Sequence, residues 1–63
     1  MKAWIKVERG PYHFWVTLFI SDRGHRFETE PEGFKTKRGA LALANRWAEY
    51  LGGLEVKDLT GED

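Results

Sequence analysis

The stretch Tyr12-His13-Phe14-Trp15-Val16-Thr17-Leu18-Phe19-Ile20-Ser21 decides the fold of this 63-residue chain. Its side chains alternate between two sets, and a period of two is typical of a β-strand whose faces differ. The first set is apolar or aromatic: Tyr12, Phe14, Val16, Leu18 and Ile20. The second set is mixed: His13, Trp15, Thr17, Phe19 and Ser21. We therefore expect a long strand over residues 12–21, with the first set in the core.

Two shorter strands are predicted beside it. Residues 3–8 alternate in the same way and end at the turn signal Arg9-Gly10-Pro11. Residues 25–30 follow the hairpin turn Asp22-Arg23-Gly24, and Pro31-Glu32-Gly33 ends them. The three strands are expected to form one antiparallel sheet.

The second hairpin has two allowed registers. A two- or four-residue turn pairs Phe27 near Ile20 and adds it to the core with Ile5 and Val7. A three-residue turn places Phe27 beside Phe19 and points Arg26 and Glu28 into the core. We prefer the first register because it keeps those charges in water, although the sequence permits both.

One helix is predicted after the strands, from Lys37 to about Leu51. Thr36 is the expected N-cap and Gly52-Gly53 the C-cap signal. The apolar face contains Ala40, Leu43, Ala44, Trp47, Ala48 and Leu51, with Leu41 and Tyr50 beside it. The fold class is therefore α+β: a three-stranded antiparallel sheet with one C-terminal helix on one face (βββα). Residues 54–57 could add a short fourth strand. We expect one domain over residues 1–57 and a frayed acidic tail over 58–63.

Composition narrows the class of protein. The formal net charge is zero and there is no cysteine, so neither a disulfide nor a thiolate metal site is expected. No apolar run approaches the roughly 20 residues that span a bilayer, and no signal-peptide core follows the N-terminus. We expect a cytoplasmic protein that does not enter membranes.

The sheet face without the helix is the predicted binding surface. It would carry Trp4, Lys6, His13, Trp15, Thr17, Phe19 and Arg26. Aromatic side chains on a solvated face are unusual and indicate an interface. A tight first turn would make Trp4 and Trp15 cross-strand neighbours. The alternative interpretation is structural: the aromatic pair stiffens the sheet, or the C-terminal tail covers it.

The start of the helix is a second predicted site. Lys35, Lys37 and Arg38 surround Thr36, although cations are disfavoured at a helix N-terminus. An anion such as a backbone phosphate would compensate, because free N–H groups and basic side chains would converge on it. The alternative is that these charges are solvated and serve only solubility.

Catalytic patterns are absent from the sequence. No nucleophile motif surrounds Ser21, and His13 and His25 have no metal-ligand spacing. No Gly-rich loop joins a strand to a helix. We expect no enzyme activity, no cofactor, no metal and no small-molecule substrate.

The stretch Gly33-Phe34-Lys35-Thr36-Lys37-Arg38-Gly39-Ala40, leading into a Trp-containing helix, resembles the arm-type DNA-binding domains at the N-termini of tyrosine integrases. The strand Phe14-Trp15-Val16-Thr17-Leu18 and the turn at Gly24 fit the same pattern. A bacterial ββ(β)α family of unknown function is similar to about the same degree. The integrase resemblance implies that the open sheet face enters the major groove of DNA. It implies DNA contacts by Trp4, Lys6, Trp15, Thr17 and Arg26, and phosphate contacts by Lys35, Lys37 and Arg38.

Two functional hypotheses follow. The first, which we prefer slightly, is a small phage or mobile-element protein that binds double-stranded DNA. Glu8 and Glu28 on the same face, and Glu30 if the third strand extends that far, oppose phosphate. The second is a protein-binding module, such as a phage-encoded, anti-CRISPR-like inhibitor of a host defence complex or a small regulatory subunit. It rests on the neutral net charge and on the aromatic and Arg side chains typical of interfaces. Under either hypothesis the protein is expected to be a monomer or a weak homodimer.

Overall fold

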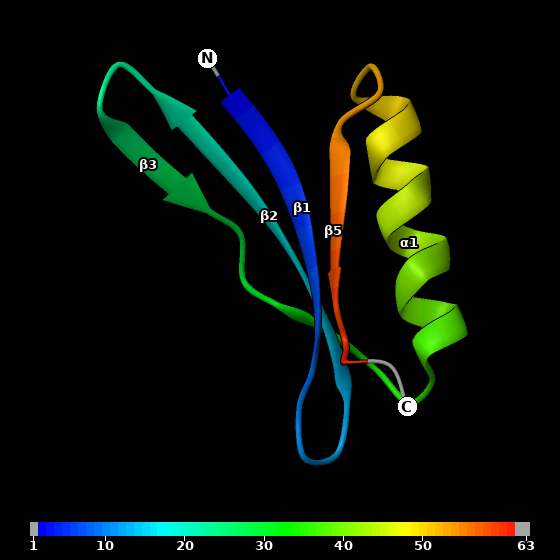
Figure 1. Ribbon diagram of the computed structural model, residues 1–63. Helices are drawn as coiled ribbons and strands as arrows, with labels where there is room; N and C mark the ends of the chain where they lie inside the picture. Colours follow the sequence, from blue (N-terminus) through cyan, green and yellow to red (C-terminus); the bar gives the residue numbers. More distant parts are fainter. Residues whose placement is uncertain (1, 62–63) are drawn as a thin grey trace.

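The computed structural model describes residues 2–61 and has one helix packed on one face of a mixed sheet (Figure 1). The elements are β1 (Lys2–Arg9), β2 (Phe14–Asp22), β3 (His25–Glu28), β4 (Glu32–Phe34), α1 (Lys37–Tyr50) and β5 (Glu55–Leu59). The strand order is β3-β2-β1-β5, and β4 also pairs with β2. The α+β class is thus confirmed. No helix in residues 2–61 combines the length and the apolar character that a membrane crossing requires.

Strand β5 changes the topology from the expected one. It pairs in parallel with β1, with Val56 opposite Ile5, so the expectation of a purely antiparallel three-stranded sheet is wrong. The optional fourth strand at 54–57 exists, but it runs to Leu59. Thr60 after it is only 3% exposed. Of the residues expected to form a frayed acidic tail, Asp58 and Leu59 lie in β5 and Thr60 is buried, so the expectation is wrong for them; residues 62 and 63 lie outside the described residues.

A bulge separates β3 from β4 along the same edge of β2. Phe19 pairs with Glu28 and Val16 with Glu32, so residues 29–31 stand opposite only residues 17–18. Thr29 holds this gap: its N–H donates to the Leu18 carbonyl at 3.1 Å, and its Oγ1 accepts the Leu18 N–H at 3.1 Å. The extra residue is a β-bulge, and Pro31 is suited to it because it has no N–H for a partner.

The bulge shifts the alternation of the edge by one residue. Phe34 therefore lies opposite Phe14 on the helix side, and Gly33 lies opposite Trp15 on the other side. Without the extra residue these two positions would exchange faces. The expectation that residues 31–33 only end a strand is wrong, because residues 32–34 re-enter the sheet.

The first hairpin has a longer loop than expected. Arg9 pairs with Phe14, and residues 10–13 form a loop closed by the Gly10 N–H, which donates to the His13 carbonyl at 2.7 Å. Tyr12 is 86% exposed in this loop and does not belong to the strand. The register pairs Trp4 with Phe19. The tight first turn that would have paired Trp4 with Trp15 does not form, and the two residues are not cross-strand neighbours.

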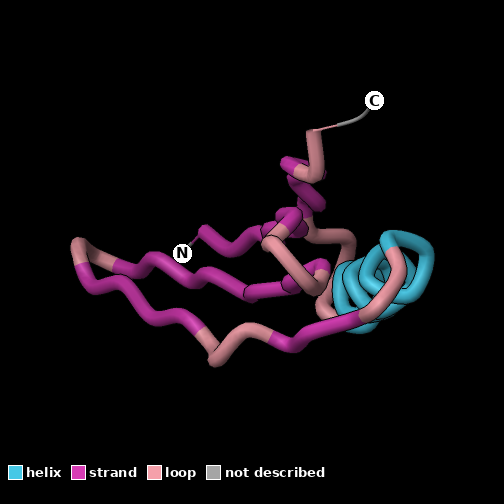
Figure 2. Tube along the Cα trace, turned by 90° about the horizontal axis from the view of Figure 1, so that it is seen from below, coloured by secondary structure: helices cyan, strands magenta, loops and turns pink. Residues whose placement is uncertain are grey.

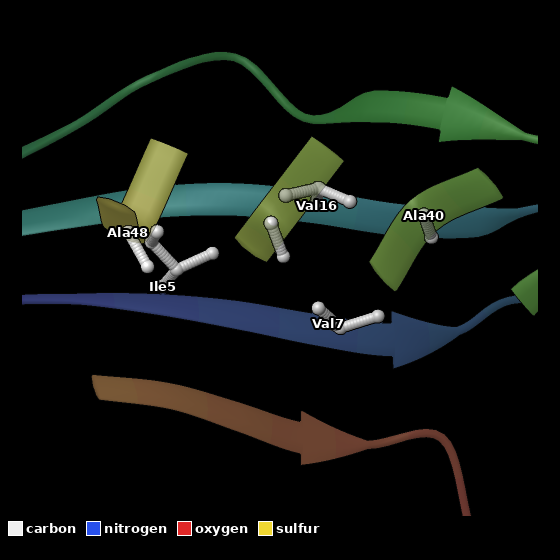
Figure 3. Close-up of a cluster of buried hydrophobic side chains, with 6 residues drawn as sticks. Ile5, Val7, Val16, Ala40 and Ala48 are labelled. Carbon is white, nitrogen blue, oxygen red and sulfur yellow. The ribbon is translucent and has the colours of Figure 1, made fainter. Parts of the chain in front are cut away.

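The helix packs closely on β1 and β2 through alanine. Ala40, Ala44 and Ala48 are buried against the fully buried Ile5, Val7 and Val16, as Figure 3 shows. These small side chains let the helix backbone approach the sheet. The predicted N-cap is confirmed, because the Thr36 hydroxyl accepts the Gly39 N–H at 3.1 Å. Gly52 and Gly53 follow the helix at φ 92° and 88°, which agrees with the C-cap signal.

The core is shorter than β2. Phe27 pairs with Ile20, so the preferred register is confirmed, but Phe27 is 60% exposed and its assignment to the core is wrong. The 14-residue helix is about 21 Å long, whereas 9 residues of β2 reach about 30 Å. The β2–β3 hairpin also turns away from α1, so the helix does not cover it (Figures 1 and 2). Leu51, also expected in the core, is 46% exposed beyond the last turn.

Candidate functional site

Most of the residues predicted to bind a partner lie on the sheet face opposite the helix, which is named the open face. Directly paired residues share a face of a sheet, and the pairing puts Lys6 opposite Thr17 and Phe19 opposite Glu28. The helix lies on the other side (Figure 2). The open face comprises Lys2, Trp4, Lys6, Glu8, Trp15, Thr17, Phe19, Ser21, Arg26, Glu28, Glu55, Lys57 and Leu59, and Glu30 joins it at the bulge.

A stacked aromatic pair forms the centre of the open face. The Trp4 and Phe19 ring centroids are 4.5 Å apart, and the ring planes differ by 12°. The Lys57 ammonium lies 4.3 Å from the Trp4 ring centroid, and that of Lys6 lies 5.0 Å from the Phe19 centroid. Both rings are only partly exposed because neighbouring side chains cover them. Stacking and cation–π contacts hold this cluster together without a second layer.

Trp15 lies apart from this pair. It is opposite Glu8, two rows along the sheet from Trp4. Its indole covers Gly33, where an added Cβ would lie 2.9 Å from the ring. The His13 ring is tilted against the indole at 5.4 Å. His13 belongs to the loop and not to β2, but it still borders the open face as expected.

A hollow of about 310 Å³ lies between the aromatic pair and the bulge. It is lined by Lys6, Glu8, Thr17, Phe19, Glu28, Thr29, Glu30 and Pro31. Thr17 lies on the open face as expected, but it is only 4% exposed and forms part of the floor of the hollow. The Lys6 ammonium forms an ion pair with Glu8 at 3.2 Å.

Charges on the open face are balanced in number but unevenly placed. Lys2, Lys6, Arg26 and Lys57 are matched by Glu8, Glu28, Glu30 and Glu55. Lys2 and Arg26 border a second hollow beside Trp4, whereas three of the carboxylates border the hollow near the bulge. The face therefore has a basic end and an acidic end on either side of the aromatic pair.

The basic residues at the helix start lie apart from the open face, because α1 covers the opposite side of the sheet. The Lys37 ammonium lies 3.6 Å from a carboxylate oxygen of Asp58, so an internal carboxylate is already beside it. Lys35 and Arg38 are exposed, and the Thr36 hydroxyl caps the helix. The two predicted sets of binding residues are thus not brought together.

Thr60 organises the Asp58 carboxylate next to Lys37. The Thr60 hydroxyl donates to Asp58 Oδ1 at 2.7 Å, and its backbone N–H donates to the same oxygen at 3.0 Å. These two hydrogen bonds, with help from the Lys37 charge, hold the pKa of Asp58 below its ordinary value of 3.8. The carboxylate therefore joins β5 to the start of α1.

No family model, no curated protein and no solved structure matches this chain. The likeness to integrase arm domains therefore stays a prediction from the short stretches that carry it. Within the described residues, no group of three His, Cys, Asp or Glu side chains is placed to hold a metal ion.

Sequence reasoning missed several members of the open face. Lys57 and Glu55 were overlooked because the fourth strand was treated as optional, although Leu54 and Val56 already show the alternation of a strand. Glu30 was expected on this face only if the third strand extended that far; β3 ends at Glu28, and Glu30 lines the hollow from the bulge. The alternation at Leu54 and Val56 could have indicated Glu55 and Lys57. The position of Glu30 depends on a break in the two-residue period of the strand, which the sequence does not mark.

Proposed function

We propose that this protein binds a protein partner through the open face of its sheet. The observation that carries the proposal is the Trp4–Phe19 stack at the centre of a face with balanced charge. Interfaces between proteins concentrate binding energy in central aromatic side chains and surround them with polar groups of both signs. The open face has this arrangement.

Charge balance is the reason for favouring a protein over DNA. Affinity for DNA comes largely from cations that replace counterions on phosphates. On the open face, Glu8, Glu28 and Glu30 would oppose that contribution close to the aromatic pair. A protein surface with charges of both signs would complement such a face.

Binding to double-stranded DNA is the second candidate. It is supported by the exposed Lys35 and Arg38 at the helix start, and by the integrase resemblance of that stretch. The Trp4 ring beside Lys57 also offers a stacking surface next to a cation. Because α1 lies opposite the open face, this mode would use the helix start and the open face separately.

Site-specific photo-crosslinking tests the protein proposal. One variant carries a benzophenone side chain at position 57, beside Trp4, and a matched control carries the benzophenone at position 49, on the outer side of α1. Each variant is irradiated in an extract of the source organism. We expect position 57 to yield a discrete crosslinked protein that position 49 does not. Addition of Trp4→Leu should abolish that product. A product that persists with Trp4→Leu, or appears equally from position 49, would contradict the proposal.

An NMR titration decides between the two candidates. The ¹⁵N-labelled protein is mixed with a random-sequence DNA duplex at low salt and then at high salt. If a protein partner is the function, the amides of Lys6, Trp15, Arg26 and Thr36 should not move. Shifts at these amides that high salt reverses would favour DNA instead, because phosphate contacts weaken steeply with salt.

A further inference from the structure

We propose that the hollow between the aromatic pair and the bulge binds the guanidinium group of an arginine side chain. This inference rests on the proposed function, and it names the chemistry by which a partner is recognised. A suitable partner presents an arginine that enters the hollow while its apolar side chains cover Trp4 and Phe19.

The charge of the hollow is the first support. Glu8, Glu28 and Glu30 line it, and Lys6 is the single cation among the lining residues. Lys6 forms its ion pair with Glu8. No described cation forms an ion pair with Glu28 or Glu30, so two carboxylates are left to attract a positive group. A guanidinium would place a positive charge between these two carboxylates.

The floor of the hollow is an independent support. Thr17 is 4% exposed, and none of the described residues forms a hydrogen bond with its hydroxyl. No fully buried side-chain N or O atom among the described residues lacks a hydrogen-bond partner, so the Thr17 hydroxyl is reached by solvent from the hollow. It is therefore available to accept a hydrogen bond from a ligand there. The Phe19 ring beside it offers its face to a cation, as its contact with Lys6 at 5.0 Å illustrates.

The spread of the acceptors favours guanidinium over other cations. A guanidinium has five N–H donors in a planar fork and is weakly hydrated, so it can serve several acceptors and stack on an aromatic ring at once. The carboxylates of the hollow come from β1, β3 and the bulge, on different sides of the Thr17 floor. An ammonium of a lysine is compact and more strongly hydrated, and it lacks the flat shape that fits against Phe19.

The test uses N-acetyl-arginine methylamide as the probe and the citrulline analogue as its uncharged isostere. Both are titrated into the ¹⁵N-labelled protein while amide shifts are recorded. We expect the arginine probe to shift the amides of Thr17, Glu28 and Thr29 in a saturable way, and the citrulline probe to bind at least about threefold more weakly. Equal binding of both probes, or shifts spread evenly over the surface, would overturn the inference.

Four single variants sharpen the test because each changes one charge. Glu28→Gln and Glu30→Gln should each weaken the arginine probe by about two- to fivefold. Glu49→Gln, on the outer side of α1, removes the same charge far from the hollow and should leave the affinity unchanged. Lys6→Met removes the competing internal cation and should strengthen binding. Weakening by Glu49→Gln equal to that by Glu28→Gln would mean that only net charge is sensed, which overturns the site.

The two proposals can fail separately. If position 57 crosslinks a partner but the arginine probe does not bind, the open face binds proteins by another chemistry and the arginine site is wrong. If the probe binds but no crosslink depends on Trp4, the hollow is an arginine site and the wider interface is wrong.

Discussion

The two faces of the sheet bury apolar surface in different ways. Under α1, the small or branched side chains of Ile5, Val7 and Val16 are fully buried because a second layer covers them. On the open face, Trp4 and Phe19 are large rings stacked on each other and covered in part by lysine side chains. The apolar side chains of β1 and β2 are thus buried by the helix on one face. On the other face they are covered only by other side chains of the sheet.

This difference separates folding from recognition. Tight packing against alanines leaves no space for another molecule, and each buried methyl group contributes directly to stability. The rings of the open face are partly exposed and their covering lysine side chains are movable, so a partner can take the place of those side chains. We expect substitutions on the helix side to change stability, and substitutions on the open face to change binding more than stability.

The largest effect should come from Ile5→Ala. Ile5 is fully buried between β1 and α1, and such a truncation costs about 2–5 kcal/mol of unfolding free energy. A domain of this size is marginally stable, so most of the protein should be unfolded at 25 °C. Urea denaturation followed by far-UV circular dichroism measures the loss. A cost below about 1 kcal/mol would show that the helix face does not dominate folding.

A smaller effect is expected from Trp4→Leu. The substitution removes the stack with Phe19 but keeps an apolar side chain, and we expect a cost of about 1–2 kcal/mol with the fold retained. Phe19→Leu and the double variant complete a double-mutant cycle in urea. A coupling energy of about 0.5–1.5 kcal/mol is expected. Complete unfolding by Trp4→Leu would make the open face a second core and remove the contrast between the faces.

The smallest effect concerns the link between α1 and β5. The pKa of Asp58 is lowered on folding, so its contribution to stability is present above its ordinary pKa of 3.8 and is lost as the pH falls through the lower folded value. Acid titration of stability should therefore show a decline below about pH 4 that Asp58→Asn removes in part. Carbon-detected NMR titration of the Asp58 carboxyl checks the direction. A folded pKa above 3.8 would contradict the link.

Signals close together in the sequence allowed the helix and the second hairpin to be predicted. Thr36 and Gly52 mark both ends of α1, and the apolar alternation around Gly24 selected the register of Phe27. These features depend on hydrogen bonds and packing between neighbours a few residues apart. The central strand and the division into two faces followed from the same alternation.

Features that depend on distant contacts were not predicted. The parallel pairing of β5 with β1 leaves no local signature, and the bulge beside Thr29 breaks the period on which strand prediction depends. The exposure of Phe27 follows from the way the β2–β3 hairpin turns away from α1, which no single stretch encodes (Figures 1 and 2). The length of the first loop decided that Trp4 meets Phe19, because turn residues indicate where a turn lies more reliably than how long it is.

The parallel arrangement of β1 and β5 also determines how the domain would respond to a pulling force. The first and last strands are neighbours and run in the same direction (Figure 1). Tension applied through Lys2 and Thr60 would slide these strands along each other, and their backbone hydrogen bonds would be loaded in shear together. In the β2–β3 hairpin, tension across the open end would break the bonds one after another. The pairing of β1 with β5 should therefore resist extension better than the pairing of the β2–β3 hairpin does.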